Sequence, residues 1–149
     1  MTETQEDAVR SAEFKTIREH LSLTITGIAG LLRVSDATVK NWEKGKYSPP
    51  AGVAAEVERL EDYTRRCVDA VAGDARERGM ILVWRTTEEM PPGPARVLGA
   101  AWWRSVAARA RERVPEVVIG YGDELDALTG SRDATLGRAA TPAVLPPTR

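Results

Sequence analysis

The residue types that perform chemistry are sparse in this chain of 149 residues. It contains one cysteine, Cys67, and one histidine, His20. A single cysteine cannot close an internal disulfide, and a single histidine cannot build a metal cluster without many carboxylate ligands. The sequence also lacks a G-x-S-x-G motif, a glycine-rich phosphate loop and a nucleophile beside a base. We therefore expect a reduced, cytoplasmic type of protein that is not an enzyme and needs no cofactor.

Positive charge is concentrated in one part of the sequence. Residues 11–50 hold six basic and four acidic side chains, whereas residues 51–79 hold five basic and seven acidic ones. The net charge of -1 argues against coating of nucleic acid through bulk positive charge, because that mode of binding is driven by displaced counterions. The chemistry that this distribution favours is a local contact with phosphate groups.

Apolar spacing predicts the first element around this basic region. The first ten residues are polar, so we expect them to form a frayed lead-in and not a signal peptide. Phe14, Ile17 and Leu21 then fall on one face of a helix that begins near Ser11. No stretch reaches the roughly 18 apolar residues that cross a bilayer, so we expect no membrane partner.

Two further short helices are predicted close together. Thr24 and Ser35 are candidate N-caps, because a hydroxyl at that position accepts a bond from a free backbone amide. The inward side chains would be Ile28, Ala29, Leu31 and Leu32 in the first helix and Val39 and Trp42 in the second. Since only Arg33 and Val34 separate these helices, they cannot pack antiparallel and must cross at a steep angle, as in a helix-turn-helix.

The rest of the chain predicts a second module. Gly45 ends the third helix, and Ser48 is a candidate N-cap with Pro49 at the first position of the next helix. The later elements expected are a long helix over 50–78, a strand over 80–86, a loop over 90–94, a helix over 97–113, a strand over 115–121 and a flexible tail over 130–149. An isolated strand pair is marginal in water, so these strands should pair with each other, against a helix or across a dimer.

Residues 23–46 resemble the Xre/Cro-like helix-turn-helix of phage and bacterial repressors. The positions in register with that family are Ala29, Val34, Ser35, Val39, Trp42, Glu43 and Gly45. The resemblance implies a lambda-repressor-like headpiece that binds double-stranded DNA in a bacterial cell or a phage-infected host. It also implies that the second helix of the motif enters the major groove.

The resemblance assigns roles by position. The base-reading residues would be Asp36, Ala37, Thr38 and Asn41, and the phosphate-binding residues would be Arg33, Ser35, Lys40, Lys44 and Lys46. Asn41 would bond adenine, Thr38 would touch a thymine methyl, and Asp36 would accept from cytosine N4. Arg18 and Glu43 would form a structural pair that holds the first helix to the third.

Some positions depart from the family pattern. Arg33 stands where the family has a turn glycine, so its backbone must adopt an awkward conformation. Ile25 and Gly27 replace the usual glutamine and glutamate, which removes one familiar DNA contact. Asp36 would repel nearby phosphates unless a base satisfies it. These departures leave the base preference open.

The C-terminal half resembles, more weakly, the dimerisation region of anti-CRISPR-associated (YdiL-like) repressors. The shared order is a long helix, a strand, a loop, residues 96–102 leading into an inner helix, and a last strand. We expect Val68, Val71, Val83, Trp84, Trp102 and Trp103 at a dimer interface. Adjacent Trp102 and Trp103 should not both face inward, so one would mark the contact.

These expectations combine into a mostly α protein with a small β element, divided into four segments. They are a lead-in (1–10), a helix-turn-helix domain (11–58), a helix and two-strand dimerisation module (59–129) and a tail (130–149). The function expected is that of a homodimeric, autoregulatory repressor on an inverted-repeat operator. An antitoxin-type protein that also masks a partner protein is the alternative, and a protein-interaction adaptor without DNA binding is a third class.

Overall fold

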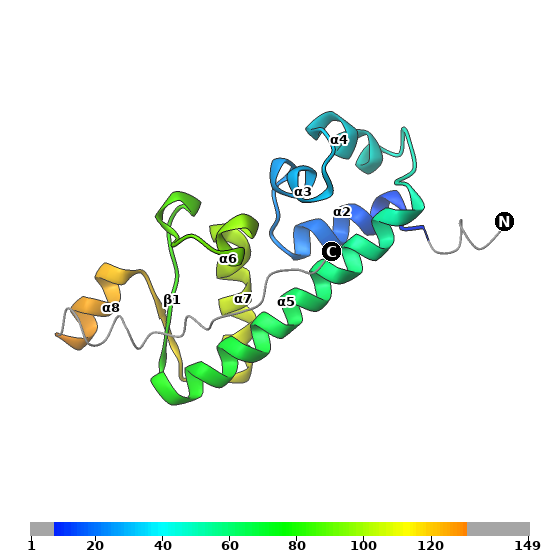
Figure 1. Cartoon of the computed structure of the whole chain (residues 1–149). Coiled ribbons are helices and arrows are strands. Elements are labelled where there is room, and N and C mark those ends of the chain that lie inside the picture. The colour runs from blue at the N-terminus through cyan, green and yellow to red at the C-terminus, as the bar shows by residue number, and fades with distance from the viewer. Residues whose placement is uncertain (1–7, 131–149) are drawn as a thin grey trace. The chain divides into compact units, whose positions relative to one another are not determined.

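Helices form most of the computed structural model, which describes residues 8–130 (Figure 1). In chain order the elements are α2 (Ser11–His20), α3 (Ile25–Leu32), α4 (Asp36–Lys44), α5 (Ala51–Arg78), β1 (Met80–Leu82), the 3-10 helix η1 (Thr87–Glu89), α6 (Pro94–Leu98), α7 (Ala100–Arg113), β2 (Val118–Gly120) and α8 (Gly122–Thr129). The prediction of a mostly α protein with a small β element is confirmed. Within residues 8–130, no helix combines the length and the apolar character that crossing a membrane requires.

The described residues divide into two compact units, with the boundary between Asp62 and Tyr63. The first unit contains α2, α3, α4 and the start of α5, and the second contains the rest of α5 and everything up to α8. The predicted boundary lay at residues 58 and 59. The predicted lead-in and tail fall largely outside the described residues.

The first unit is built as its local signals predict. The Thr24 hydroxyl accepts from the Gly27 amide at 2.9 Å, and the Ser35 hydroxyl accepts from the Thr38 amide at 3.1 Å, so both predicted N-caps are confirmed. Gly45 follows α4 with φ of 82°, the left-handed conformation that glycine adopts at little cost. These signals fix where α3 begins and where α4 begins and ends.

The start of α5 differs from the prediction. The helix begins at Ala51, and the Val53 amide bonds the Pro50 carbonyl at 3.0 Å. Ser48 is therefore too far upstream to cap it, and Pro49 is a buried loop residue and not the first helical position. Consecutive prolines made the position of the first turn ambiguous. The far end agrees with the expectation, because α5 ends at Arg78 and Gly79 follows with φ of 75°.

The second unit contains a parallel strand pair between helices. β1 pairs with β2 in the register Ile81 with Ile119, and the chain passes between them through η1, α6 and α7. Ile81 and Val83 are buried. On the opposite face of the pair, a Cβ at Gly120 would lie 2.8 Å from the Leu125 side chain, so α8 packs closely over this glycine. The two strands therefore pair with each other, which is one of the three arrangements that the sequence left open.

Several elements of the second unit differ from the prediction. Each strand has three residues and not seven, because the neighbouring residues leave the ladder for turns. Gly99, with φ of 105°, divides the predicted helix over 97–113 into α6 and α7. The helix α8 was not predicted, because its eight residues bury only Leu125 and so show little periodicity.

The predicted dimer-interface residues lie mostly inside the subunit. Val68, Val71, Val83, Trp102 and Trp103 are buried, and Trp84 is half-buried. The expectation that adjacent Trp102 and Trp103 cannot both face inward is wrong. The Trp102 indole donates to the Thr64 hydroxyl on α5 at 3.0 Å, whereas the Trp103 indole donates to the Leu82 carbonyl of β1 at 2.8 Å. α7 lies between two partners, so both of its sides are buried.

Candidate functional site

The connection between α3 and α4 is a tight turn of three residues. Arg33 adopts φ of 62° and ψ of 42°, and its amide and that of Val34 bond carbonyls in the last turn of α3. A left-handed conformation costs a residue with a side chain about 1–2 kcal/mol. The sequence predicted this awkward backbone at Arg33, where a glycine would be the usual choice.

A small buried core holds α4 in place. α4 packs against both α2 and α3, and Val39 and Trp42 are its buried residues. The Trp42 ring meets Phe14 of α2 edge to face, with ring centroids 5.6 Å apart. Ala29 on α3 is 1% exposed, and its small side chain lets the helices approach closely. The orientation of α4 therefore depends on contacts with two different helices.

Arg18 and Glu43 add a polar clamp between α2 and α4. The Arg18 Nε and Nη2 atoms donate to the two carboxylate oxygens of Glu43 at 2.5 and 3.0 Å, and Nη1 donates to the Leu23 carbonyl at 2.9 Å. The hydrogen-bonded carboxylate of Glu43 raises the pKa of Arg18. The predicted structural pair is thus present, and it directs the Glu43 carboxylate away from solvent, with 7% of its side chain exposed.

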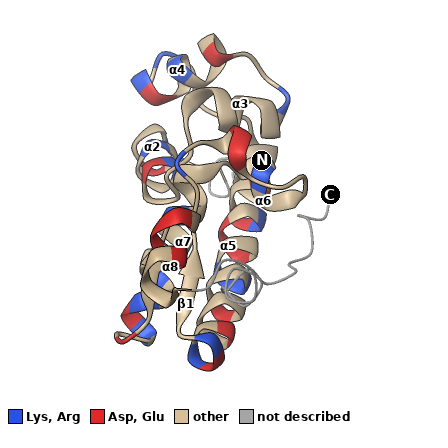
Figure 2. Ribbon diagram, turned by 90° about the vertical axis from the view of Figure 1, so that its left-hand side faces the viewer, with Lys and Arg blue, Asp and Glu red and all other residues tan. Residues whose placement is uncertain are grey.

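The predicted nucleic-acid residues all lie on the accessible side of this motif. The exposed ones are Arg33, Ser35, Ala37, Lys40, Lys44 and Lys46, and the half-buried ones are Asp36, Thr38 and Asn41. Figure 2 shows basic and acidic residues interspersed on α4 and not a uniformly basic helix. Because Glu43 is turned inward against Arg18, the charges that α4 exposes to solvent are mainly those of its lysines.

Three of these polar side chains already have partners within the unit. The Thr26 hydroxyl on α3 donates to Asp36 Oδ2 at 2.6 Å, and the hydroxyls of Ser35 and Thr38 lie 2.9 Å apart. By contrast, the Asn41 side-chain amide has no hydrogen-bond partner among residues 8–130. Asn41 can therefore offer both a donor and an acceptor to a ligand without breaking an existing bond.

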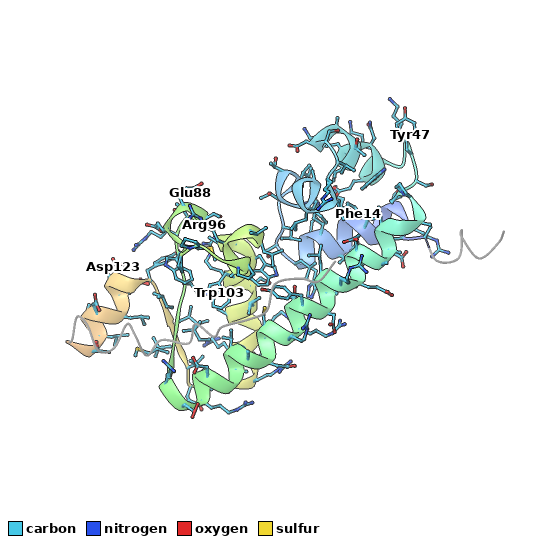
Figure 3. All side chains as sticks on the ribbon, viewed as in Figure 1. Phe14, Tyr47, Glu88, Arg96, Trp103 and Asp123 are labelled. Atoms are coloured by element: carbon cyan, nitrogen blue, oxygen red, sulfur yellow. The ribbon has the colours of Figure 1, made fainter. Side chains whose placement is uncertain are left out.

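Sequence reasoning missed two residues of this surface. Thr26 was not singled out, because its partner Asp36 lies ten residues away on another helix. Tyr47 is 57% exposed in the loop after α4, with the Lys46 ammonium 5.6 Å from its ring centroid (Figure 3). An aromatic residue in an otherwise polar loop was the available signal for Tyr47.

The second unit offers an open pocket at the carboxyl ends of β1 and β2. The pocket has a volume of about 310 Å³ and is bordered by Arg85, Tyr121 and Asp123. The Arg85 guanidinium bonds both carboxylate oxygens of Asp123 at 3.1 and 3.2 Å, lies 4.1 Å from the Tyr121 ring centroid, and lowers the pKa of Asp123. These groups satisfy one another, and residues 8–130 contain no cluster of potential metal ligands.

Comparisons with known proteins add no assignment: no protein-family model matches the chain, and a search of curated proteins returns no match. The α3–α4 surface is therefore the feature from which a function can be inferred.

Proposed function

We propose that this chain is a sequence-specific DNA-binding protein that acts as a homodimeric transcriptional repressor on an inverted-repeat operator. In this proposal α3, the turn at Arg33 and α4 form a helix-turn-helix, and α4 enters the major groove. The observation that carries the proposal is the division of α4 into two faces. Val39 and Trp42 are buried, while the side that bears Ala37, Lys40 and Lys44 is exposed.

The accessible face of α4 supplies groups for both kinds of DNA contact. Asn41 has a free amide, which suits a bidentate bond to adenine N6 and N7. Lys40 and Lys44 are exposed cations one turn apart, which suits contact with successive phosphates. The exposed α3–α4 turn adds Arg33 as another cation. Base contacts give sequence preference, and phosphate contacts fix the position of the helix on the duplex.

Two substitutions on α4 test the proposal, with footprinting on the DNA upstream of the gene used to find the operator. Asn41→Ala should weaken operator binding by about 1–3 kcal/mol and relax the preference at one base pair, while binding to unrelated duplex is unchanged. Lys44→Ala should weaken binding to all sequences alike and reduce the salt slope by about one unit. Fluorescence anisotropy at several salt concentrations measures both effects.

Arg76→Ala is the matched control, because it removes one exposed positive charge from α5 in the second unit. It should leave the sequence preference and the salt slope near those of the unsubstituted protein. The proposal is wrong if the purified chain binds no duplex DNA at low salt. It is also wrong if Asn41→Ala and Lys44→Ala bind as the unsubstituted protein does.

A further inference from the structure

The strand β2 has one edge that bonds β1 and one that is open. The Val118 amide donates to the Gly79 carbonyl and the Gly120 carbonyl accepts from the Val83 amide, both at 3.0 Å, so these two residues face β1. Because the direction of backbone groups alternates along a strand, the amide and carbonyl of Ile119 point away from β1. Neither group has a hydrogen-bond partner among residues 8–130. The outer edge of β2 is therefore free to pair.

The opposite edge of the strand pair is largely covered by side chains of α7. Met80, Leu82 and Trp84 carry the outward carbonyls of this edge, and α7 side chains bond the carbonyls of Leu82 and Trp84. The Leu82 carbonyl accepts from the Trp103 indole at 2.8 Å, and the Trp84 carbonyl accepts from Arg104 Nη1 at 2.5 Å. An open edge is a template for another strand, and proteins commonly cover such edges. Side chains of α7 thus cover most of the edge of β1, whereas none covers Ile119, which favours β2 as the pairing strand.

The groups that flank Ile119 restrict how a new strand can pair. The Val117 amide already donates to the Val114 carbonyl at 3.0 Å, and the Tyr121 amide donates to Glu124 Oε1 at 2.9 Å. Pairing must therefore be short and centred on Ile119. An antiparallel partner satisfies this condition, because two residues directly opposite each other exchange both of their bonds.

We propose that two copies of this chain associate through β2, antiparallel and about a two-fold axis, with Ile119 opposite Ile119 of the partner subunit. The two strand pairs then form a continuous sheet in the order β1-β2-β2-β1. This inference rests on the proposed function, since an inverted repeat requires a two-fold dimer, and it replaces the buried residues first expected at the interface. In this register Val118, which is 39% exposed, lies opposite the partner subunit's Gly120, so its side chain would pack against α8, which covers that glycine.

Charge around β2 favours a second copy in this orientation. Before the strand, the end of α7 carries Arg109, Arg111 and Arg113 together with Glu112, and Glu116 follows in the connecting turn; of these, Arg113 is already bonded to Asp69. After the strand, α8 carries only acidic groups, Asp123, Glu124 and Asp126, of which Asp123 is already bonded to Arg85. Antiparallel pairing places the segment before β2 of one copy beside the segment after β2 of the other. Basic and acidic segments then meet twice, once on each side of the axis.

Two substitutions at the strand edge test the association without DNA. Val118→Lys places a charge on the open edge. Ile119→Pro removes the outward amide and leaves the bonds to β1, which are made through Val118 and Gly120, although it also replaces the half-buried isoleucine side chain. Each should weaken the dimer by about tenfold or more in sedimentation equilibrium, with an unchanged far-UV circular dichroism spectrum. Val97→Lys, at a valine of α6 that is 65% exposed, is the matched control and should leave the dimer intact.

The possible results separate this inference from the proposed function. A monomeric unsubstituted protein overturns the inference, as does a dimer that survives both edge substitutions or dissociates only with Val97→Lys. If either Val118→Lys or Ile119→Pro unfolds the protein, the dimer affinity of the other variant tests the inference. A monomeric Val118→Lys protein should still bind a single half-site. If it and the unsubstituted dimer bind no DNA at all, the helix-turn-helix proposal fails while the strand-edge dimer stands.

Discussion

Replacing Glu43 with glutamine tests whether the clamp between α2 and α4 stabilises the first unit. The Glu43 carboxylate accepts two bonds from Arg18, and the two side chains are 7% and 11% exposed. Glutamine has nearly the same shape, but it is neutral and offers one acceptor oxygen instead of two. The change therefore leaves the Arg18 guanidinium, which is 11% exposed, without its buried counter-charge and with one acceptor oxygen fewer.

The expected cost follows from this degree of burial. Breaking a fully buried ion pair costs about 3–5 kcal/mol, because the remaining charge has no compensation. Exposed pairs contribute about 0–1 kcal/mol. With roughly a tenth of each side chain exposed, we expect Glu43→Gln to lower the free energy of unfolding of the first unit by about 2–3 kcal/mol. Removing both charges with Arg18→Met and Glu43→Leu together should cost less than the sum of the single changes.

Urea unfolding and hydrogen exchange of the α4 amides measure these free energies for each variant. Glu19→Gln is the matched control, since this carboxylate lies 3.9 Å from Arg18 with 60% of its side chain exposed. It should change stability by less than about 0.5 kcal/mol. If Glu43→Gln is as mild as Glu19→Gln, or if the two charge removals are additive, the clamp does not hold α4 and the reasoning is refuted.

Three further perturbations address other parts of the chain. Arg33→Gly should relieve the left-handed backbone, raise the free energy of unfolding by up to about 1 kcal/mol and so raise the thermal midpoint. The same change removes a cation, so fluorescence anisotropy should show weaker DNA binding at low salt. Burial raises the pKa of Cys67 from 9.0 to about 11, so between these pH values the thiolate forms only in the unfolded chain. Stability should therefore fall as pH rises from 9 to 11, more steeply than in Cys67→Ala, and an equal slope would contradict this account. Thr26→Val should release Asp36 and, with little change in the denaturation midpoint, alter the base preference measured by selection from a random duplex pool.

Local signals were sufficient to predict the first unit. Thr24, Ser35 and Gly45 fix the ends of α3 and α4 through bonds and backbone angles that involve residues at most a few positions away. The inward positions of Val39 and Trp42 follow from helical spacing alone. The contact between Arg18 and Glu43 spans 25 residues, and only the family resemblance indicated it.

Longer-range features of the second unit could not be predicted in the same way. The burial of both Trp102 and Trp103 depends on α7 having partners on two sides, which helical spacing cannot show. The short α8 follows β2 because Glu124 caps the Tyr121 amide and Leu125 fits over Gly120. These contacts form only in the folded sheet. The spacing of apolar residues along one segment therefore cannot predict them.

The net charge of α4 is a poor guide to the charge that this helix exposes to solvent. Counting residues gives α4 two acidic and two basic side chains, which suggests a helix indifferent to phosphate. The fold separates these charges: Glu43 is directed inward to Arg18, and Asp36 is held by the Thr26 hydroxyl at the start of the helix. Lys40 and Lys44 remain exposed. A chain with a net charge of -1 can thus present a locally basic face, as the proposed DNA contact requires, because a duplex within a Debye length responds to the charges nearest to it and much less to the total.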